Sequence, residues 1–298
     1  MRFDGYHPAI NLIYFASVIA AAILFRHPAF VAIAFVCSFA YSVKLGGRRA
    51  LIFNICLVPA AAIWTMWYAA YHHFGVTPIR RNFIGNEITL ESLVYGGVIG
   101  IVVSSVVMWM SCVHRVFSTD KIVYLFGRVS PRLSLMLAIL LRAVPRIKAQ
   151  GRKISLAQKC IGRGTNQGNI LKRCLNALRI ASVLITWTAE SFVSTADSMR
   201  CRGYTLPKRT AFAIYRFDNR DRSFVIAIFI CLTILLTGDL FDQTNILYNP
   251  RIIMNRVTPL SYVFYAGYAA LCLMPMALEI AGEIKFKRLR REKVCANF

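Results

Sequence analysis

The sequence predicts an all-α integral membrane protein, and three observations support this fold class. The chain of 298 residues is 57% hydrophobic and carries a net charge of +23. Its mean hydropathy is +0.53, so a soluble fold would have too little polar side chain to cover its surface. The basic residues lie mainly between apolar runs, which is the usual arrangement of spans and cytoplasmic segments in membrane proteins.

Apolar runs predict about six transmembrane helices, because a helix needs about 20 mostly apolar residues, within a range of about 17–25, to cross a bilayer. The first run is interpreted as a retained helix, since it lacks a convincing small-residue cleavage site and further spans follow it. The fifth run is short and is expected to extend beyond its apolar core. The predicted spans cover approximately residues 9–25, 29–45, 50–71, 92–112, 223–238 and 258–280.

The distribution of charge predicts the orientation of these spans. Basic residues are concentrated after the second span, between the fourth and fifth spans, and in the C-terminal tail. If these segments and the N-terminus are cytoplasmic, the opposite side keeps only Arg26, Arg80, Arg81, Arg251 and Arg256. Six spans with both termini in the cytoplasm satisfy the excess of positive charge expected on that side.

The predicted spans divide the chain into three parts. Residues 1–112 hold four spans, and residues 223–298 hold two spans and a basic tail. Residues 113–222 lie between them and are too basic for an ordinary set of spans. From residue 114 to residue 222 there are 21 lysines and arginines but only five aspartates and glutamates. We expect this central region to form a cytoplasmic module.

Two long amphipathic helices are predicted in this module. After Pro145, apolar side chains recur at a spacing of three and four residues as far as Ile161. A second run with the same spacing extends from Ile170 to Met199. Its central part, residues 178–193, resembles a seventh span. Charged residues near both of its ends and its short apolar core favour a helix that lies partly in or under the bilayer.

Each of these helices ends in a small residue, an arginine and a glycine. The tripeptides are Gly162-Arg163-Gly164 and Cys201-Arg202-Gly203. One such end is most simply a helix terminus, because glycine caps helices and a basic residue complements the helix dipole. The repetition favours a further role, since arginine presents a planar fork of donors to carboxylates and the glycine after it lets the chain turn away. Two matched ends predict two equivalent docking points for a partner that occurs in twos.

No catalytic residues, metal site or cofactor are predicted. The chain lacks a GxxxxGK[ST] phosphate loop, and its histidines and carboxylates form no acid–base set. The nine cysteines show no CxxC spacing and are interpreted as free thiols. His72 and His73 would point to different faces of a helix, so they do not indicate a metal site. Because the basic excess follows the predicted topology, membrane lipids and acidic protein surfaces are the expected partners, and nucleic acid is not.

Several segments resemble one family of membrane proteins. In the predicted module they are "LRAVPRI", "AQKCIGRG", "ADSMRCRGYTLPKRT" and "YRFD", and nearer the N-terminus they are "YHPAINLIYFASV" and "HHFGVTPI…GNEITLESLVYGG". Together they are similar to the T component of energy-coupling factor (ECF) transporters, the EcfT/CbiQ-like family. The resemblance covers most of the chain, and the paired arginine motifs are its specific part.

The resemblance implies a non-catalytic subunit of an ATP-driven importer in the cell membrane of a prokaryote. Such a subunit lies between two ABC-type ATPases and a substrate-binding S component, and it transmits ATP-driven motion during the uptake of a vitamin or a metal ion. Its coupling helices end in Ala-Arg-Gly-like motifs that dock in the ATPases. By position, Arg163 and Arg202 would be the docking arginines. Gly162 and Cys201 stand where alanine is usual.

The S component would contact the apolar faces of the same two helices. The residues expected there are Ile154, Leu171, Leu175 and Leu178. The main alternative function is a self-sufficient secondary transporter, which should show intramembrane charges or broken helices in related halves. A membrane-embedded enzyme is a further alternative. The sequence does not name the substrate, because in this family the S component selects it.

Overall fold

The computed structural model of the chain describes residues 3–296, except 73, 82–86, 165, 167–168, 205, 207–214, 216, 242–243, 245, 249–251 and 255–257. It divides into two compact units. One, here called the membrane unit, comprises residues 1–118 and 215–298, and the other, the basic unit, comprises residues 119–214. The described residues are almost entirely helical and include several helices apolar enough to cross a membrane, which confirms the predicted all-α membrane protein.

The described residues of the membrane unit form five α-helices. They are α1 (Pro8–Leu24), α2 (Pro28–Tyr71), α3 (Leu90–Val116), α7 (Asn219–Leu240) and α8 (Pro259–Ala296). Among the described residues, four of these helices, α2, α3, α7 and α8, are long and apolar enough to span a bilayer, whereas α1 is a shorter apolar helix of 17 residues. A 3-10 turn, η1 (Phe3–Gly5), precedes α1, and a two-stranded hairpin, β1 (Pro78–Arg81) and β2 (Glu87–Thr89), precedes α3.

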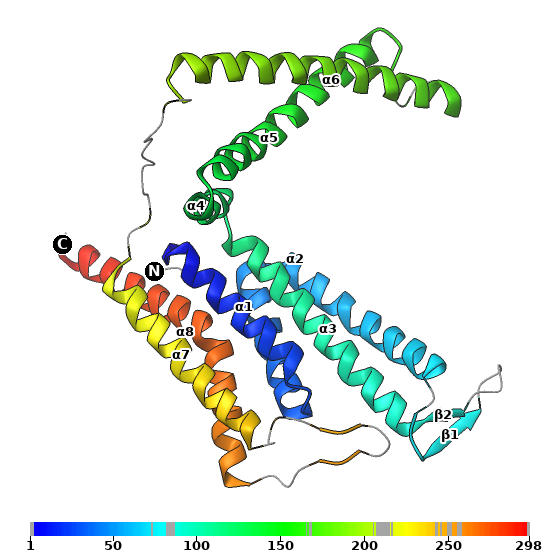
Figure 1. Ribbon diagram of the computed structural model, residues 1–298, viewed down its shortest axis with the longest axis vertical. Coiled ribbons are helices and arrows are strands. Elements are labelled where there is room, and N and C mark those ends of the chain that lie inside the picture. Colours follow the sequence, from blue (N-terminus) through cyan, green and yellow to red (C-terminus); the bar gives the residue numbers. More distant parts are fainter. Residues whose placement is uncertain are drawn as a thin grey trace. The chain divides into compact units, whose positions relative to one another are not determined.

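Helix α2 contains two of the predicted spans, 29–45 and 50–71. Its 44 residues would extend about 66 Å if straight, which is about twice the thickness of the bilayer core. The backbone leaves the helical conformation at Gly47, with φ 58° and ψ −144°. The Ser42 hydroxyl donates to Asn54 Oδ1 at 3.3 Å although the residues are 12 positions apart, so the two arms meet at a sharp turn (Figure 1).

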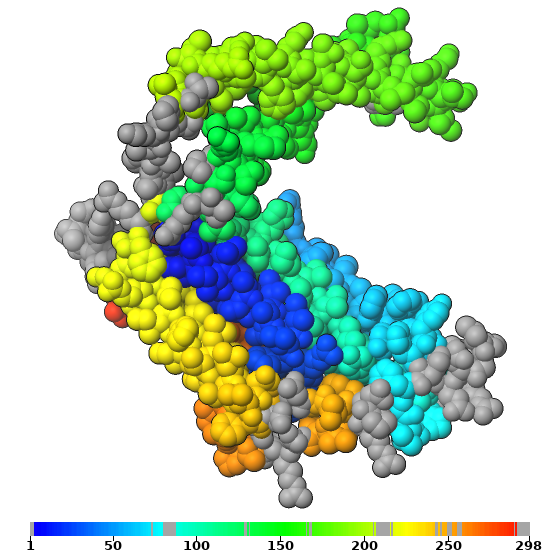
Figure 2. All heavy atoms as spheres, in the orientation of Figure 1, coloured from blue at the N-terminus to red at the C-terminus, as the bar shows by residue number. Residues whose placement is uncertain are grey.

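An aromatic cluster fills the membrane unit where α1 meets α3 and α7. The ring of Tyr14 lies 5.4 Å from Phe3 and 6.4 Å from Trp109, measured between centroids. Phe3 also packs on Phe224 of α7, with centroids 5.6 Å apart. Tyr14, Phe3 and Trp109 are fully buried. Helix α1 therefore lies between α3 and α7, and Figure 2 shows its blue side chains filling the space beside the yellow α7.

The first two helices begin with the same three residues, histidine, proline and alanine. In each case the histidine is the N-cap, and its Nδ1 accepts a hydrogen bond at 3.3 Å from the backbone N–H of the alanine two residues later. The proline occupies the first turn, where its missing N–H removes no helical hydrogen bond. At the second cap, Nε2 of His27 lies 3.4 Å from the Tyr265 hydroxyl oxygen. With Nδ1 acting as acceptor, His27 is the neutral Nε2–H tautomer, and this N–H donates to Tyr265.

The His27 cap predicts a loss of stability in mild acid. Burial lowers the pKa of His27 from its ordinary value of 6.5, so the folded state favours the neutral ring. Its contribution is therefore complete above pH 6.5 and is lost as the pH falls through the lowered pKa. Protonation also removes the Nδ1 acceptor, a change comparable to losing an N-cap, at a cost of about 1 kcal/mol. The test is the thermal stability of the protein in micelles from pH 7.5 to pH 4.5.

His27→Asn is the control for this prediction, because asparagine is an N-cap acceptor that does not titrate in this range. The pH dependence of the wild type should exceed that of His27→Asn between pH 7.5 and pH 4.5. Identical pH profiles for the two proteins would contradict the assignment of the acid sensitivity to this cap.

Where the structure describes the basic unit, it forms three helices, α4 (Thr119–Val129), α5 (Pro131–Cys160) and α6 (Ile170–Cys201). The sequence did not indicate α4. The prediction that the first long helix begins after Pro145 is wrong, because α5 begins at Pro131 and continues through Pro145. Neither α5 nor α6 is among the helices that are long and apolar enough to cross a membrane. Residues 178–193 therefore lie within a helix that is too polar to form a seventh transmembrane span.

Candidate functional site

The first predicted docking end lies at the C-terminus of α5 and is closed by a glycine cap. Gly162 has φ 76°, a left-handed conformation that glycine adopts without a steric penalty. Its N–H donates to the Lys159 carbonyl at 3.1 Å, and the N–H of Arg163 donates to the Gln158 carbonyl at 2.9 Å. These two bonds form a Schellman motif, which satisfies carbonyls that the helix end leaves without donors.

The second predicted end, at the C-terminus of α6, has the same cap. Gly203 has φ 74°, and its N–H donates to the Arg200 carbonyl at 3.0 Å. The next N–H, that of Tyr204, donates to the Met199 carbonyl at 3.1 Å. Both ends are therefore Schellman motifs, in which the first residue beyond the helix cap is a left-handed glycine.

The arginines occupy different positions in the two caps. At the α5 end, the turning glycine precedes Arg163, whereas at the α6 end it follows Arg202. The expectation that the glycine after each arginine turns the chain is therefore wrong for the first end. Gly164 has another role there, since it is buried and its carbonyl accepts a hydrogen bond from Asn176 Nδ2 at 3.2 Å. The left-handed position falls on the first glycine after the last helical turn, and that glycine is Gly162.

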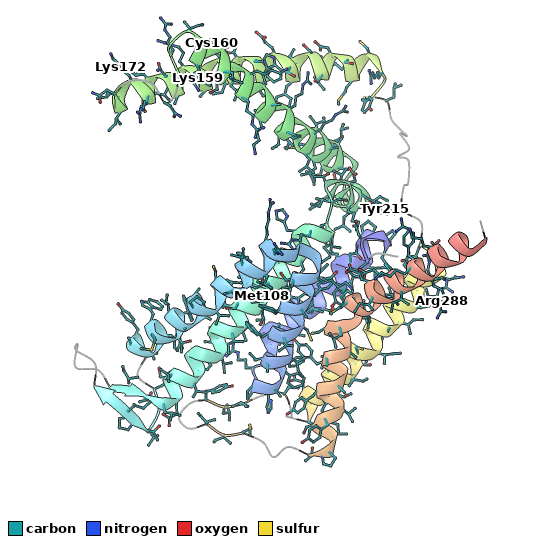
Figure 3. The ribbon with its side chains drawn as sticks, turned by 180° about the vertical axis from the view of Figure 1, so that it is seen from behind. Met108, Lys159, Cys160, Lys172, Tyr215 and Arg288 are labelled. Atoms are coloured by element: carbon teal, nitrogen blue, oxygen red, sulfur yellow. The ribbon has the colours of Figure 1, made fainter. Side chains whose placement is uncertain are left out.

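The two arginines are exposed and lie far apart. Neither side chain makes an ion pair or hydrogen bond with another described residue. Arg202 directly follows α6, whose 32 residues extend about 48 Å. Arg163 is held near the other end of α6 by the bond between Gly164 and Asn176. Figure 3 marks that end by Lys159 and Cys160 of α5 and by Lys172 of α6.

The caps give a prediction about stability. Gly162→Ala and Gly203→Ala should each cost about 1 kcal/mol, because an L side chain is strained at positive φ. Asparagine tolerates this conformation better, so Gly162→Asn and Gly203→Asn should restore part of the loss. Hydrogen exchange of the last turns of α5 and α6 would measure the effect. Equal protection in the alanine and asparagine variants would contradict it.

The residues predicted to contact an S component do not all have the same environment. Leu171, Leu175 and Leu178 lie on one face of α6 and are 76%, 59% and 62% exposed. Ile154 on α5 is half-buried. The three leucines form an apolar stripe that the basic unit leaves uncovered, as expected of a surface that contacts a partner or lipid.

The described residues hold no group of three or more histidines, cysteines, aspartates and glutamates placed to bind a metal ion. His72 stacks on Tyr68, with ring centroids 4.0 Å apart and planes inclined by 5°. His73 lies outside the described residues. The exposed arginines and the apolar stripe are features of the basic unit that suggest recognition of other molecules.

Comparisons with known proteins agree with a membrane transport component. No family model matches the chain. A region of 105 residues is 33% identical to the energy-coupling factor transporter transmembrane protein EcfT of Lactococcus lactis subsp. cremoris (strain MG1363). This region covers 35% of the present chain and 39% of that relative, so the chain matches well under half the length of the curated relative. The similarity indicates a transporter-associated membrane protein.

Proposed function

We propose that this chain is a T component of an energy-coupling factor transporter in the cell membrane. It transmits the ATP-driven motion of two ABC-type ATPase subunits to a substrate-binding S component during uptake of a vitamin or metal ion. The observation that carries the proposal is the pair of capped helix ends, each with an exposed arginine whose side chain pairs with no other described residue. The partial similarity to a transmembrane protein of such a transporter supports the same function.

The geometry of α6 favours two docking partners over one. A helix of 32 residues is about 48 Å long, so Arg163 and Arg202 are too distant to enter one small socket. Each guanidinium can form paired hydrogen bonds with a carboxylate. Because the Schellman bonds fix the backbone at both helix ends, movement of a docked partner would be passed to the helix rather than absorbed by a loose terminus.

The offset between the two caps makes the docking points unequal in this proposal. Arg202 is the cap residue of α6, and Arg163 is the second residue beyond the cap of α5. The Arg202 side chain therefore branches from the residue before the turning glycine, and the Arg163 side chain from the residue after it. The exposed stripe of Leu171, Leu175 and Leu178 would supply the contact with the S component, which selects the substrate.

Co-purification with the two ATPase subunits and the S component tests the proposed function. Arg163→Glu and Arg202→Glu should each weaken recovery of the ATPases by at least about tenfold, equivalent to about 1.4 kcal/mol, and the double variant should abolish it. Lys148→Glu with Arg179→Glu is the matched control, since both residues are exposed and lie within α5 and α6 rather than at their capped ends. Retention of the ATPases by the Arg163/Arg202 double variant would contradict the proposal.

Transport in liposomes separates this function from secondary transport. The purified chain alone should move no substrate, whereas the complete complex should do so when ATP is supplied. Uptake by the chain alone, driven by an ion gradient, would identify a self-sufficient secondary transporter instead.

A further inference from the structure

The two long helices of the basic unit enclose a groove. They approach closely where Gly151 of α5 faces Leu184 of α6, since a Cβ added to Gly151 would lie 3.4 Å from Leu184 Cδ2. Beyond this contact, the first half of α5 and the second half of α6 line an open groove of about 580 Å³. Its volume is in the range of pockets that hold small organic ligands, about 300–1,000 Å³.

Three arginines line the groove. Arg142 and Arg146 belong to α5, and Arg202 directly follows the last helical residue of α6. None of the three makes an ion pair or hydrogen bond with another described residue. Arg146 lies over the ring of Trp187, with its Cζ 5.6 Å from the ring centroid, and this cation–π contact orients the guanidinium. Glu190 is the single acidic residue among those that line the groove.

Apolar side chains also line the groove. They include Leu135, Ala138, Ile139 and Phe192. The hydroxyls of Ser191, Thr195 and Tyr204 lie among the lining residues as well. In the same part of the chain, α5 exposes Leu133, Met136 and Leu140 by 50%, 57% and 42%. The first half of α5 therefore presents apolar side chains both inside the groove and on its outer surface, which suits an environment of acyl chains.

We propose that this groove binds an anionic phospholipid. The phosphate would form charge-assisted hydrogen bonds with Arg142 and Arg146, and an acyl chain would lie along Ile139 and Phe192. Basic pockets between helices on the cytoplasmic side of a membrane bind such headgroups, and tryptophan favours the boundary between headgroups and acyl chains. An acidic protein segment would satisfy the arginines, but it would not account for the apolar lining of the groove and the exposed apolar side chains of α5 beside it.

The proposal is independent of the transport function, and its test uses the full chain purified in a neutral detergent. Native mass spectrometry would titrate phosphatidylglycerol and, separately, phosphatidylcholine. The wild type should retain one phosphatidylglycerol at least about tenfold more tightly than phosphatidylcholine. In Arg142→Gln/Arg146→Gln this preference should fall by about tenfold or more. Lys148→Gln/Arg152→Gln removes the same charge from α5 outside the groove and should keep the preference.

Several outcomes would overturn the proposal. One is equal loss in both double variants, which would indicate attraction by overall charge. A second is displacement of the bound lipid by inorganic phosphate or glycerol phosphate as effectively as by phosphatidylglycerol, which would indicate a site for free phosphate. A third is absence of retained lipid together with saturable binding of an acidic peptide, which would indicate a protein partner.

Fluorescence provides a second measurement that does not depend on the charge variants. Phosphatidylglycerol with brominated acyl chains should quench Trp187, and Trp187→Phe should lose the corresponding fraction of quenching. Quenching that is unchanged in Trp187→Phe would contradict the placement of the acyl chain in this groove.

Discussion

Replacement of Gly47 by alanine should lower the free energy of unfolding by about 1–3 kcal/mol, because it places an L side chain in a backbone conformation that is almost exclusive to glycine. Gly47 has φ 58° and ψ −144°, and an added Cβ would meet no atom within 4 Å. The cost is therefore a property of the backbone and not of crowding. The substitution should also change the shape of α2, because the strained backbone at residue 47 could relax only if the angle between the two arms increased.

The neighbouring glycine provides a contrast of mechanism. A Cβ on Gly46 would clash with Arg115 Nη1, and this nitrogen donates to the Ser42 carbonyl at 3.2 Å. Gly46→Ala should therefore be destabilising because it displaces the Arg115 side chain, and Arg115→Ala should relieve part of that cost. The loss in Gly47→Ala should be unaffected by Arg115→Ala, since no atom surrounds its Cβ.

A titration with sodium dodecyl sulfate in mixed micelles would measure these differences in stability. Gly97→Ala is the matched control, because Gly97 lies within α3 and an added Cβ would lie 3.8 Å from Thr65 Cγ2, an ordinary contact. It should not lower stability and should raise it by up to about 1 kcal/mol, because alanine is more favourable than glycine inside a helix. If Gly47→Ala changed the free energy of unfolding no more than Gly97→Ala does, the left-handed turn of α2 at Gly47 would be contradicted.

This turn shows how far the sequence predicts the membrane unit. Hydropathy separates residues 29–45 from residues 50–71, because the glycines and arginines between them are polar or small. It does not reveal that the two spans are joined without a separate loop, by a turn at Gly47 with helix on both sides. That outcome depends on Arg115, which is distant in sequence and satisfies a carbonyl at the end of the first arm. A local sequence pattern contains no information on such a contact.

The basic unit was less predictable from its sequence. Proline usually interrupts a helix, so the sequence favoured a helix start after Pro145, whereas α5 passes through that residue. The first turn of α5 is joined to α4, since the Ser134 hydroxyl donates to the Val123 carbonyl at 3.1 Å. The sequence located both arginine-bearing helix ends correctly. It could not show which glycine takes the left-handed position, because two glycines flank Arg163 and only the position of the last helical turn decides between them.

Helix α8 contains a proline whose missing hydrogen bond is replaced by a tyrosine. Pro275 lies inside α8 and has no N–H to donate to the Leu271 carbonyl four residues earlier. The Tyr14 hydroxyl of α1 lies 3.2 Å from the Leu271 oxygen and 3.3 Å from the Cys272 oxygen. It donates to a carbonyl that the proline leaves free, in a region where no water is at hand to do so. The bend of α8 in Figure 1 agrees with a helix interrupted by proline.

Tyr14→Phe should therefore cost about 1–3 kcal/mol, because it leaves a buried acceptor without a donor. In the Pro275→Ala background an N–H is restored to α8, and the same substitution should cost less by at least about 0.5 kcal/mol, the lower limit of measurable coupling between contacting groups. Tyr41→Phe is the control, since Tyr41 is equally buried and its hydroxyl has no partner among the described residues. Equal costs of Tyr14→Phe with and without Pro275 would show that the hydroxyl stabilises the fold by another contact. If Tyr14→Phe couples to Pro275→Ala and Tyr41→Phe does not, one hydrogen bond from α1 compensates for the proline in α8.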